Sequence, residues 1–451
     1  MANQKISQMP AITAAELAAS DLLAVVDVSD VSQASSGSNK KITALELKNF
    51  INESTASVSS FTWNSATASP GAAINTGSVV TNLVHDRMRR CVVNDAGVVQ
   101  YYLQSTDSTK KEDGTAAVLT GADGQVMVEI PKFWTMFSKS GTFSTWSISP
   151  VALPGYQVHP AFIKDNVEVD YRYIGAYDAC VYDTSAAAYV DGLNLDNSDA
   201  LYDYANDKLS SVAGKYPVVG VTRAQTRQLA SNRGSGWRQL DFTLWSAVQM
   251  LYVIEHQSFY SQNILGAGNT NGSYLASSAV QTDSPHTIAG ASNSLGNAST
   301  NTVNGAGVSA KPGTSFMSYR GIENFYGNAW TWLDGVNINV GTAGTFYVTN
   351  NTSSFADNTA TGHTLVTSSF PTASGYPSNF LALSSYFLPS NATGGSTTTY
   401  LTDYLYATTA LNRVLIAGGS ANNAGSAGVF YLDSSYDSAL RSRAVSARLA
   451  R

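Results

Sequence analysis

The sequence predicts an α+β protein in which β-strands dominate. Short runs of β-branched and aromatic residues alternate with turn signals along much of the chain, whereas only two segments carry strong helix signals. Stretches rich in Gly, Ser, Thr and Asn fill much of the remainder. These observations favour three parts: a small N-terminal module at residues 1–55, a β-rich linker or shaft at 56–119, and a C-terminal domain at 120–451 with two helices and long loops.

The chain of 451 residues is poor in charge. It has 26 basic and 32 acidic residues, so 13% of its residues are charged, against about 25% in typical soluble proteins. Apolar residues make up 43%, which argues against a disordered chain. This composition is typical of a β-rich particle surface or an extracellular adhesion protein. A net charge of −6 argues against binding nucleic acid by general electrostatic attraction.

The two cysteines, Cys91 and Cys180, lie far apart with no CxxC spacing, which disfavours a disulfide framework and a thiolate zinc site. We expect two separately buried thiols, with one long-range bridge as the alternative. The N-terminal MANQKISQMPAIT has no basic-then-apolar signal pattern, and the most apolar helical stretch, Leu244 to Ile254, is too short to cross a bilayer. We therefore expect synthesis in the cytoplasm without a signal peptide and no membrane insertion.

The N-terminal module is expected to combine two helix starts with a short strand. Thr13 with Glu16 and Thr43 with Glu46 both fit the capping box, and residues 22–26 between them form an apolar run typical of a strand. The stretch DLLAVVDVSD…SGSNKKITALELKNFI resembles the attachment module at the start of many phage tail-fibre proteins. That resemblance implies docking onto tail or baseplate proteins; a small αβ cap of another kind is the alternative.

Recurrent turn signals predict a β region over residues 90–130. Its short β-branched runs at 92–93, 98–103 and 125–130 are separated by turn-forming residues. Upstream, residues 53–78 are rich in Ser, Thr and Ala, which fits either a linker or an edge-rich β segment.

Two helices are predicted between residues 222 and 256. Thr222 and Gln225 form a capping box that opens a helix ending near Ser231. Asp241 can cap a second helix, whose apolar residues surround much of its circumference, so we expect burial on more than one side. Residues 262–310 and 336–410 are expected to form long loops and short strands.

The sequence offers no recognisable catalytic, cofactor or metal site. Its five histidines are scattered, and none forms an HExxH or HxxxH pair. Asp165, Glu168 and Asp170 lie close together, but their segment alternates like a strand, so we expect them to face solvent. The common nucleophile, phosphate-loop and dinucleotide motifs are missing. We therefore predict a protein that is not an enzyme and uses no cofactor.

The most informative stretch is RGIENFYGNAWTWLDG, at residues 320–335. Trp330 and Trp332 lie on one side of an alternating segment after a turn at Gly327 and Asn328, so both are expected to fill a core. The stretch resembles the GNVWEW…D segment of the formylglycine-generating-enzyme-like branch of the C-type lectin fold. The two helices, an Arg-rich C-terminal strand and the segments at 126–134, 159–162 and 169–179 fit the same domain, so the resemblance covers about residues 120–451.

This resemblance does not carry over an activity. The enzymes of the family oxidise a substrate with a cysteine pair late in the domain, and no cysteine follows Cys180 here. Animal lectins of the broader fold hold sugars through calcium ligands of the EPN or WND type, and neither string occurs.

Residues 411–451 resemble the variable region of the target proteins of diversity-generating retroelements. The pattern RVLIAGG…AGVFYL…SARL looks like their fixed scaffold, although Ala421 stands where a tryptophan is expected. Apolar residues such as Val414 and Ile416 are expected to anchor the strands. Tyr and Arg offer large contact area with few rotamers to freeze, and Ser and Asn offer adaptable hydrogen bonds. The residues predicted to face outward and bind a receptor are Ser420, Asn422, Asn423, Tyr431, Asp433, Ser435, Tyr436, Asp437, Arg441 and Arg443.

Together the resemblances predict a phage tail-fibre or tail-tip protein, carried in the virion tail, that binds a host cell-surface protein or glycan through its variable C-terminal surface. Phage members of the retroelement-target class are trimers, which implies a homotrimer. Two alternatives stay open. One is a structural tail component that packs against neighbouring tail proteins, and the other is a tail-borne glycan depolymerase.

Overall fold

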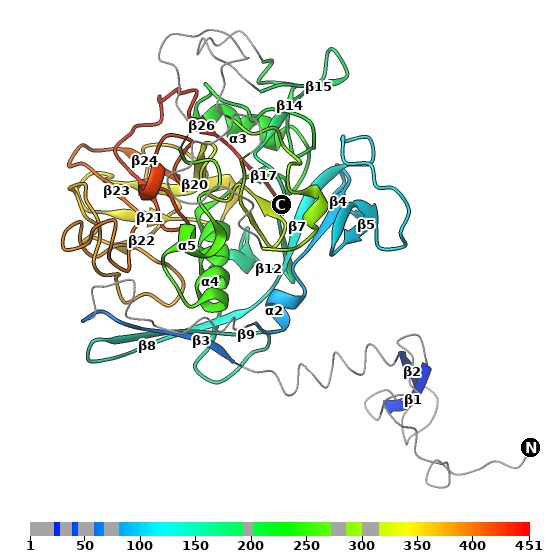
Figure 1. Ribbon diagram of the computed structural model, residues 1–451, viewed down its shortest axis with the longest axis horizontal. Coiled ribbons are helices and arrows are strands. Elements are labelled where there is room, and N and C mark those ends of the chain that lie inside the picture. The colour runs from blue at the N-terminus through cyan, green and yellow to red at the C-terminus, as the bar shows by residue number, and fades with distance from the viewer. Residues whose placement is uncertain are drawn as a thin grey trace, which may run out of the picture. The chain divides into compact units, whose positions relative to one another are not determined.

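The computed structural model describes residues 22–27, 38–43, 58–66, 81–192, 202–271, 286–299 and 315–451. The chain divides into two compact units, Met1–Ser57 and Val58–Arg451. In the first unit, β1 (Leu22–Asp27) pairs antiparallel with β2 (Ser38–Thr43), which confirms the predicted strand (Figure 1). The two helices predicted for this module lie outside the described residues.

A seven-stranded antiparallel sheet in the second unit, which we call the central sheet, has the order β17-β27-β13-β7-β4-β5-β6. Every residue of β7 (Gln125–Pro131) is buried, as expected for a strand covered on both faces. The expected boundary near residue 120 is wrong, because β4 pairs with β7 along its whole length and places the predicted shaft in the same sheet. The other strands are β4 Arg89–Val93, β5 Val99–Gln104, β6 Asp107–Lys111, β13 Tyr171–Gly175, β17 Arg238–Gln239 and β27 Leu449–Ala450.

The second large sheet has the order β22-β21-β20-β24-β25-β23, and β26 pairs parallel with the start of β20. β20 (Trp330–Ile338) begins after the predicted turn, where Gly327 and Asn328 both have positive φ. The prediction of long loops and short strands over 336–410 is confirmed. The remaining strands are β21 Phe346–Val348, β22 Thr364–Thr367, β23 Leu405–Tyr406, β24 Arg413–Ala417, β25 Leu432–Asp433 and β26 Val445–Ser446.

Smaller sheets complete the unit. β3 (Ser59–Asn64) lies at the edge of a sheet of order β10-β8-β9-β3, which confirms an edge strand in the described part of residues 53–78. The other small sheets are β15-β14-β16, β11-β12 and β18-β19. Their strands are β8 Trp134–Ser140, β9 Phe143–Ser149, β10 Gln157–Val158, β11 Ile163–Lys164, β12 Val167–Glu168, β14 Cys180–Asp183, β15 Ala188–Val190, β16 Lys208–Ser210, β18 Ser318–Tyr319 and β19 Ile322–Glu323.

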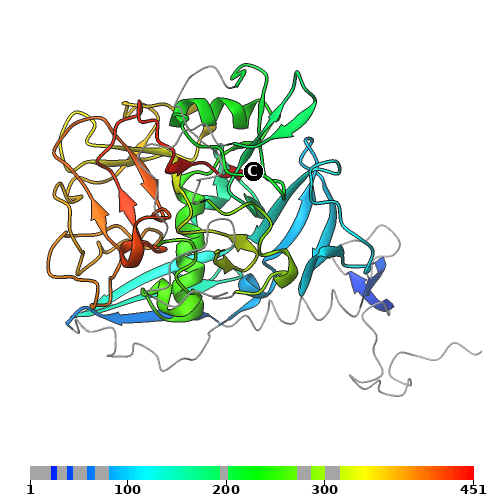
Figure 2. The ribbon, with the colours of Figure 1, turned by 45° about the horizontal axis from the view of Figure 1, so that its top comes forward.

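Both predicted helices are confirmed as α3 (Arg223–Ser231) and α4 (Phe242–His256). The Thr222 capping box and the Asp241 cap form as expected, with the Asp241 carboxylate accepting the backbone N–H of Leu244. α4 is buried from Phe242 to Glu255 and stands between the two large sheets, next to β3 and β9 (Figures 1 and 2). The main hydrophobic core therefore surrounds α4. Two shorter helices are α2 Leu83–Asp86 and α5 Ser261–Leu265.

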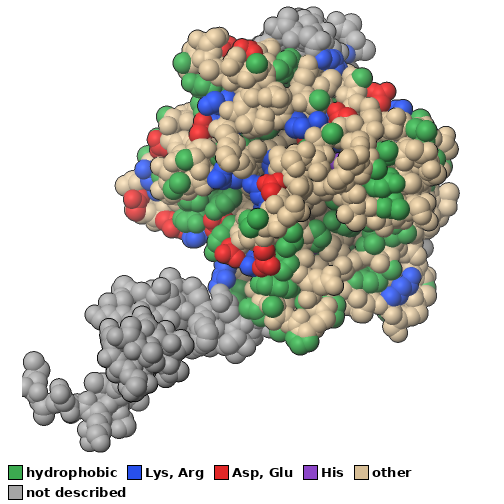
Figure 3. Space-filling view, turned by 180° about the vertical axis from the view of Figure 1, so that it is seen from behind, with side chains coloured by type: hydrophobic (Ala, Val, Ile, Leu, Met, Phe, Trp, Pro, Cys, Tyr) green, Lys and Arg blue, Asp and Glu red, His purple; other side chains and the backbone are tan. Residues whose placement is uncertain are grey.

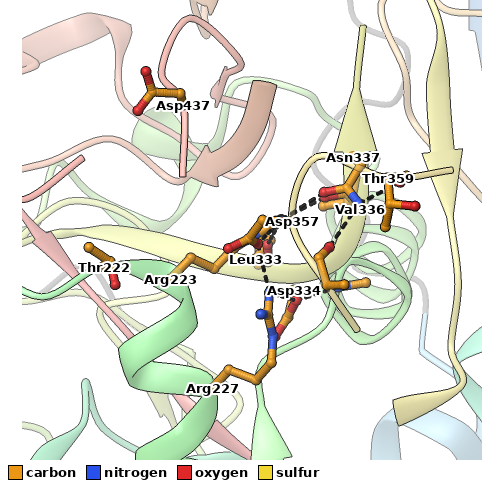
Figure 4. A network of polar contacts seen from close by, with 12 residues as sticks. Thr222, Arg223, Arg227, Leu333, Asp334, Val336, Asn337, Asp357, Thr359 and Asp437 are labelled. Carbon is orange, nitrogen blue, oxygen red and sulfur yellow. Dashed lines mark hydrogen bonds and ion pairs between the residues drawn. The ribbon is translucent and has the colours of Figure 1, made fainter. Parts of the chain in front are cut away.

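A network of buried and half-buried charges ties α3 to β20 (Figure 4). Arg227 Nε donates to Asp334 Oδ2 over 2.6 Å, and Arg223 Nη1 donates to the Val336 carbonyl over 2.6 Å. Asp357 accepts hydrogen bonds from both arginines. Burial alone would raise the pKa of Asp357, but the two arginines hold it below its ordinary value. A fully paired network of this kind fixes β20 in position, and β20 carries part of the site described below.

The predictions for the cysteines and for the acidic cluster are confirmed. Cys91 and Cys180 are both buried and free, and burial raises the pKa of Cys180 to about 12. Asp165, Glu168 and Asp170 are exposed. The face in Figure 3 is largely uncharged, with acidic and basic side chains in small scattered groups, as the composition predicts.

Candidate functional site

The C-terminal segment begins with β24, whose side chains alternate between two faces of the second large sheet. Leu415 and Ala417 point into the main core around α4. Val414 and Ile416 point to the opposite face and belong to a separate hydrophobic cluster, so their predicted anchoring role is confirmed. The segment therefore rests on a scaffold with apolar contacts on both sides.

The outer hydrophobic cluster supports the surface of interest. Trp332 and Val445 are buried in it, and Trp330 and Leu440 pack at its margin while half-buried. The core-filling role predicted for the two tryptophans is confirmed for Trp332, whereas Trp330 reaches the surface. An aromatic ring at the edge of a small core offers a rigid contact area to a partner.

The predicted receptor-binding residues differ widely in exposure. Three are exposed, four are half-buried and three are buried. The exposed residues are Asn422, Tyr436 and Asp437; the half-buried ones are Asn423, Ser435, Arg441 and Arg443; the buried ones are Ser420, Tyr431 and Asp433.

The outward orientation predicted for Ser420, Tyr431 and Asp433 is wrong. The Ser420 hydroxyl donates to the amide oxygens two and three residues along the chain, over 2.7 and 2.9 Å. The Asp433 carboxylate accepts the backbone N–H and the hydroxyl of Ser435 over 2.9 and 2.6 Å. Short polar side chains of this kind close turns on their own backbone. Ser420 and Asp433 therefore shape the loops instead of reaching a partner, and Tyr431 is buried beneath its neighbours.

The remaining predicted residues do not form one patch. Asn422 and Asn423 follow the C-terminal end of β24, in a loop that Gln262 holds by donating to the Ala424 carbonyl over 2.7 Å. The Tyr436 carbonyl instead accepts the N–H of Val414, near the other end of the strand. A five-residue strand spans about 13 Å between its end residues. The residues from 435 to 443 are therefore a surface separate from the loop at 422–423.

The last part of the predicted variable region is interior. Residues 444–450 are all buried, and β27 lies inside the central sheet. The Arg448 guanidinium pairs with Asp178 over 2.6 Å and donates to the carbonyls of Gly175 and Glu323. The burial of this end agrees with the expectation that SARL, at residues 446–449, belongs to the fixed scaffold, because its strand completes the core.

Sequence reasoning missed most of the aromatic surface beside Tyr436. The rings of Tyr376, Tyr404, Tyr406 and Tyr431 follow one another with centroid separations of 4.8, 4.5 and 6.0 Å. Trp330 lies against Tyr431, and its ring centroid is 6.5 Å from that of Tyr436. Trp330 therefore connects the four tyrosines to Tyr436. We call these six aromatic residues the tyrosine row. Tyr406 and Tyr436 are its most open members, with 36% and 37% of their surface exposed.

One local signal could have found two members of the tyrosine row. Tyr404 and Tyr406 are two positions apart in the stretch YLTDYLYA, and alternate residues of an extended segment share a face. What the sequence does not show is that β23 pairs in parallel with β25, setting Tyr406 opposite Asp433. That pairing brings residues 404–406 next to residues 431–436.

The tyrosine row carries little charge. Burial raises the pKa of Tyr436, and the neighbouring Asp433 carboxyl adds to this effect. Burial also raises the pKa of Asp433 itself. At its edge Arg413 pairs with Asp437 over 3.7 Å. The Tyr436 hydroxyl thus stays protonated at neutral pH and can both donate and accept hydrogen bonds, which suits recognition of a polar partner.

A buried acid lies next to the row in sequence. Asp403 accepts the backbone N–H of Phe430 over 2.8 Å and the hydroxyl of Thr402 over 3.2 Å. Burial raises the pKa of Asp403 to about 8. Its carboxyl is therefore largely neutral at pH 7 and adds little charge to the surface above it.

Within the described parts of the chain, no three His, Cys, Asp or Glu side chains gather so that they could hold a metal ion. No helix among the described residues has the length and apolar character needed to cross a bilayer. The chain matches none of the family models and none of the curated proteins with which it was compared.

Proposed function

We propose that this chain is a phage tail-fibre or tail-tip protein that recognises a host cell-surface protein or glycan through the tyrosine row and the turn at 435–443. The observation that carries the proposal is the continuous run of aromatic rings with Tyr406 and Tyr436 open to solvent. Tyrosines provide large, rigid contact area at a low entropy cost, and such residues dominate binding energy at interfaces. The half-buried Arg441 and Arg443 follow in the same turn region.

The resemblances support the same assignment. A C-type-lectin-like domain that displays a retroelement-type surface would explain why a firm scaffold carries uncharged aromatic and polar groups. In this proposal the N-terminal module attaches the protein to tail or baseplate proteins, and the protein acts by binding, without a cofactor or a chemical step. A homotrimer repeated around a tail would convert weak single-site contacts into high avidity.

The test is adsorption of the purified full-length chain, labelled with a fluorophore, to a panel of bacterial cells. We expect Tyr436→Ala combined with Tyr406→Ala to lower adsorption to the responsive strain by at least about tenfold, because interface tyrosines are often hot spots. Arg441→Ala should lower it less. The melting temperature of each variant should stay close to that of the parent, since these side chains are half-exposed or exposed.

Tyr171→Ala is the matched control. Tyr171 is 46% exposed on β13 of the central sheet, so its loss removes an open tyrosine without touching the row. Unchanged adsorption of the double variant on a strain that binds the parent would reject the proposal. Adsorption to no strain, together with protection of Tyr436 in assembled particles, would instead favour the structural tail component.

A further inference from the structure

A cavity of about 550 Å³ lies between the turns at one end of the central sheet and the small sheet β15-β14-β16. Its lining residues come from the turn after β4, the turn at 120–124 before β7, the three strands of the small sheet, and the end of α3. This volume lies within the range of small-molecule sites. In Figure 1, β14 and β15 stand at the upper right and β23 and β24 at the left, so the cavity is distinct from the tyrosine row.

The charged groups that line the cavity compensate one another. Asp95 accepts hydrogen bonds from Arg233 Nη1 over 2.5 Å and from Lys208 Nζ over 3.1 Å. Arg233 also donates to two groups of β16, over 2.7 and 2.6 Å. The second lining carboxylate, Asp123, accepts the hydroxyl proton of Tyr101 over 2.8 Å. Lys208 and Arg233 are both paired with Asp95, which disfavours binding of an anionic ligand. The carboxylates of Asp95 and Asp123 keep lone pairs that can accept hydrogen bonds from the hydroxyl groups of a ligand.

One wall of the cavity is aromatic and held in place. The rings of Tyr182 and Tyr189 meet edge to face with centroids 4.9 Å apart. The Tyr189 hydroxyl donates to the Gly121 carbonyl over 3.1 Å and accepts from Gln125 Nε2 over 3.3 Å. Gly121 has a φ of 99°, and a Cβ there would lie 2.3 Å from the Tyr189 ring, so only glycine fits this contact. The wall is therefore fixed before a ligand arrives, which lowers the entropy cost of binding.

We propose that this cavity binds a neutral saccharide unit. A sugar ring presents C–H groups on one face, which pack against the electron-rich face of an aromatic ring, and hydroxyl groups around its edge. Here Tyr182 and Tyr189 supply the rings, Asp95 and Asp123 accept from hydroxyls, and the Asn94 amide can both donate and accept. The proposal does not depend on the receptor-binding role of the tyrosine row.

The test is saturation-transfer NMR on the full chain with methyl glucoside, methyl galactoside and N-acetylglucosamine, and with inorganic phosphate as a competitor. We expect at least one sugar to bind with a Kd of about 1 mM or lower. Tyr182→Ala and Asp123→Asn should each weaken binding by about fivefold or more, since each removes a direct contact. Ala122→Trp should block binding as well, because residue 122 is exposed at the rim and a large side chain there fills the opening.

Two matched controls lie away from the cavity. Asp113→Asn changes an exposed carboxylate in the turn after β6, and Tyr171→Ala removes an exposed ring on β13. Both should leave sugar binding unchanged, and so should Tyr436→Ala, whose effect belongs to the proposed receptor site. The proposal is overturned if none of the sugars binds, if phosphate displaces the bound sugar, or if binding survives both Tyr182→Ala and Ala122→Trp in folded protein.

Discussion

Residues 435–443 and 444–450 are neighbours in the chain, yet they lie in opposite environments. The first stretch holds the exposed Tyr436 and the half-buried Arg441 and Arg443, whereas the second is wholly buried and holds Arg448. The second stretch contains β27, which completes the central sheet, and its arginine is paired with Asp178. One short segment therefore supplies both the proposed contact surface and the closure of the fold, and arginines five to seven positions apart differ in role.

The largest effect should follow from Arg448→Ala. The change leaves Asp178 buried without its cation, and breaking a buried pair in this way costs about 3–5 kcal/mol of unfolding free energy. Urea unfolding followed by tryptophan fluorescence measures the loss. Arg443→Ala is the matched control on the exposed side. A loss below about 1 kcal/mol for Arg448→Ala would show that the end of the chain is dispensable to the core, and the contrast between the two stretches would fail.

Asp403→Asn should raise stability, in contrast to Arg448→Ala. The buried carboxyl of Asp403 accepts hydrogen bonds from neutral groups, whereas the buried carboxyl of Asp178 is paired with an arginine. Its folded-state pKa of about 8 lies above the unfolded value of about 3.9. Between these values the folded protein binds more protons than the unfolded chain, so the parent loses stability as pH rises from about 4 to 8. The side-chain amide of asparagine does not titrate, so the variant should not lose stability at this position as pH rises.

We expect Asp403→Asn to be more stable than the parent by about 2–4 kcal/mol at pH 8 and equal to it near pH 4. Thermal unfolding across this pH range, in buffers of equal ionic strength, measures the difference. A difference that does not change with pH would mean that Asp403 titrates alike in the folded and unfolded chains.

Asp433→Ala should have a smaller effect. The carboxylate closes the turn that leads to Tyr436, through two hydrogen bonds to Ser435, and losing such bonds costs about 1 kcal/mol. Asp433→Asn keeps an acceptor and should stay within about 0.5 kcal/mol of the parent. If alanine and asparagine behave alike in both unfolding and adsorption, Asp433 does not shape the surface.

The sequence predicted those parts of the fold that depend on local signals. Thr222 and Asp241 cap the two helices at the expected residues because capping involves only neighbouring backbone groups. The boundary near residue 120 failed because β4 and β7 pair across a gap that no local pattern records. β27 lies much further from β13 in the sequence, so the scaffold pattern SARL indicates a fixed strand at this end without showing which strand it pairs with.

The candidate site could be predicted only in part, because long-range pairing also decides which polar and aromatic residues reach the surface. Tyr436 and Asp437 are exposed as predicted from the resemblance to a variable region, whereas Ser420 and Asp433, predicted on the same grounds, turn inward and bond their own loops. Tyr404 and Tyr406 were missed because only the parallel pairing of β23 with β25 brings them to the surface beside Tyr436. Residue type predicted the chemistry of the surface, and long-range pairing decided which residues share it.

The smallest effect on folding, and the sharpest test of the contrast, is expected for Arg443→Ala. Its side chain is half-buried at the start of the buried stretch, and substitutions at such surface positions usually change stability by no more than about 0.5 kcal/mol. Adsorption should nevertheless fall, since Arg443 precedes Ala444, whose carbonyl accepts the N–H of Trp330 in the tyrosine row, and arginines are frequent hot spots of binding. A loss of stability comparable to that of Arg448→Ala would place Arg443 with the core and move the border between the two stretches towards Tyr436. Lost adsorption with unchanged unfolding would place that border where the structure has it, between Arg443 and Ala444.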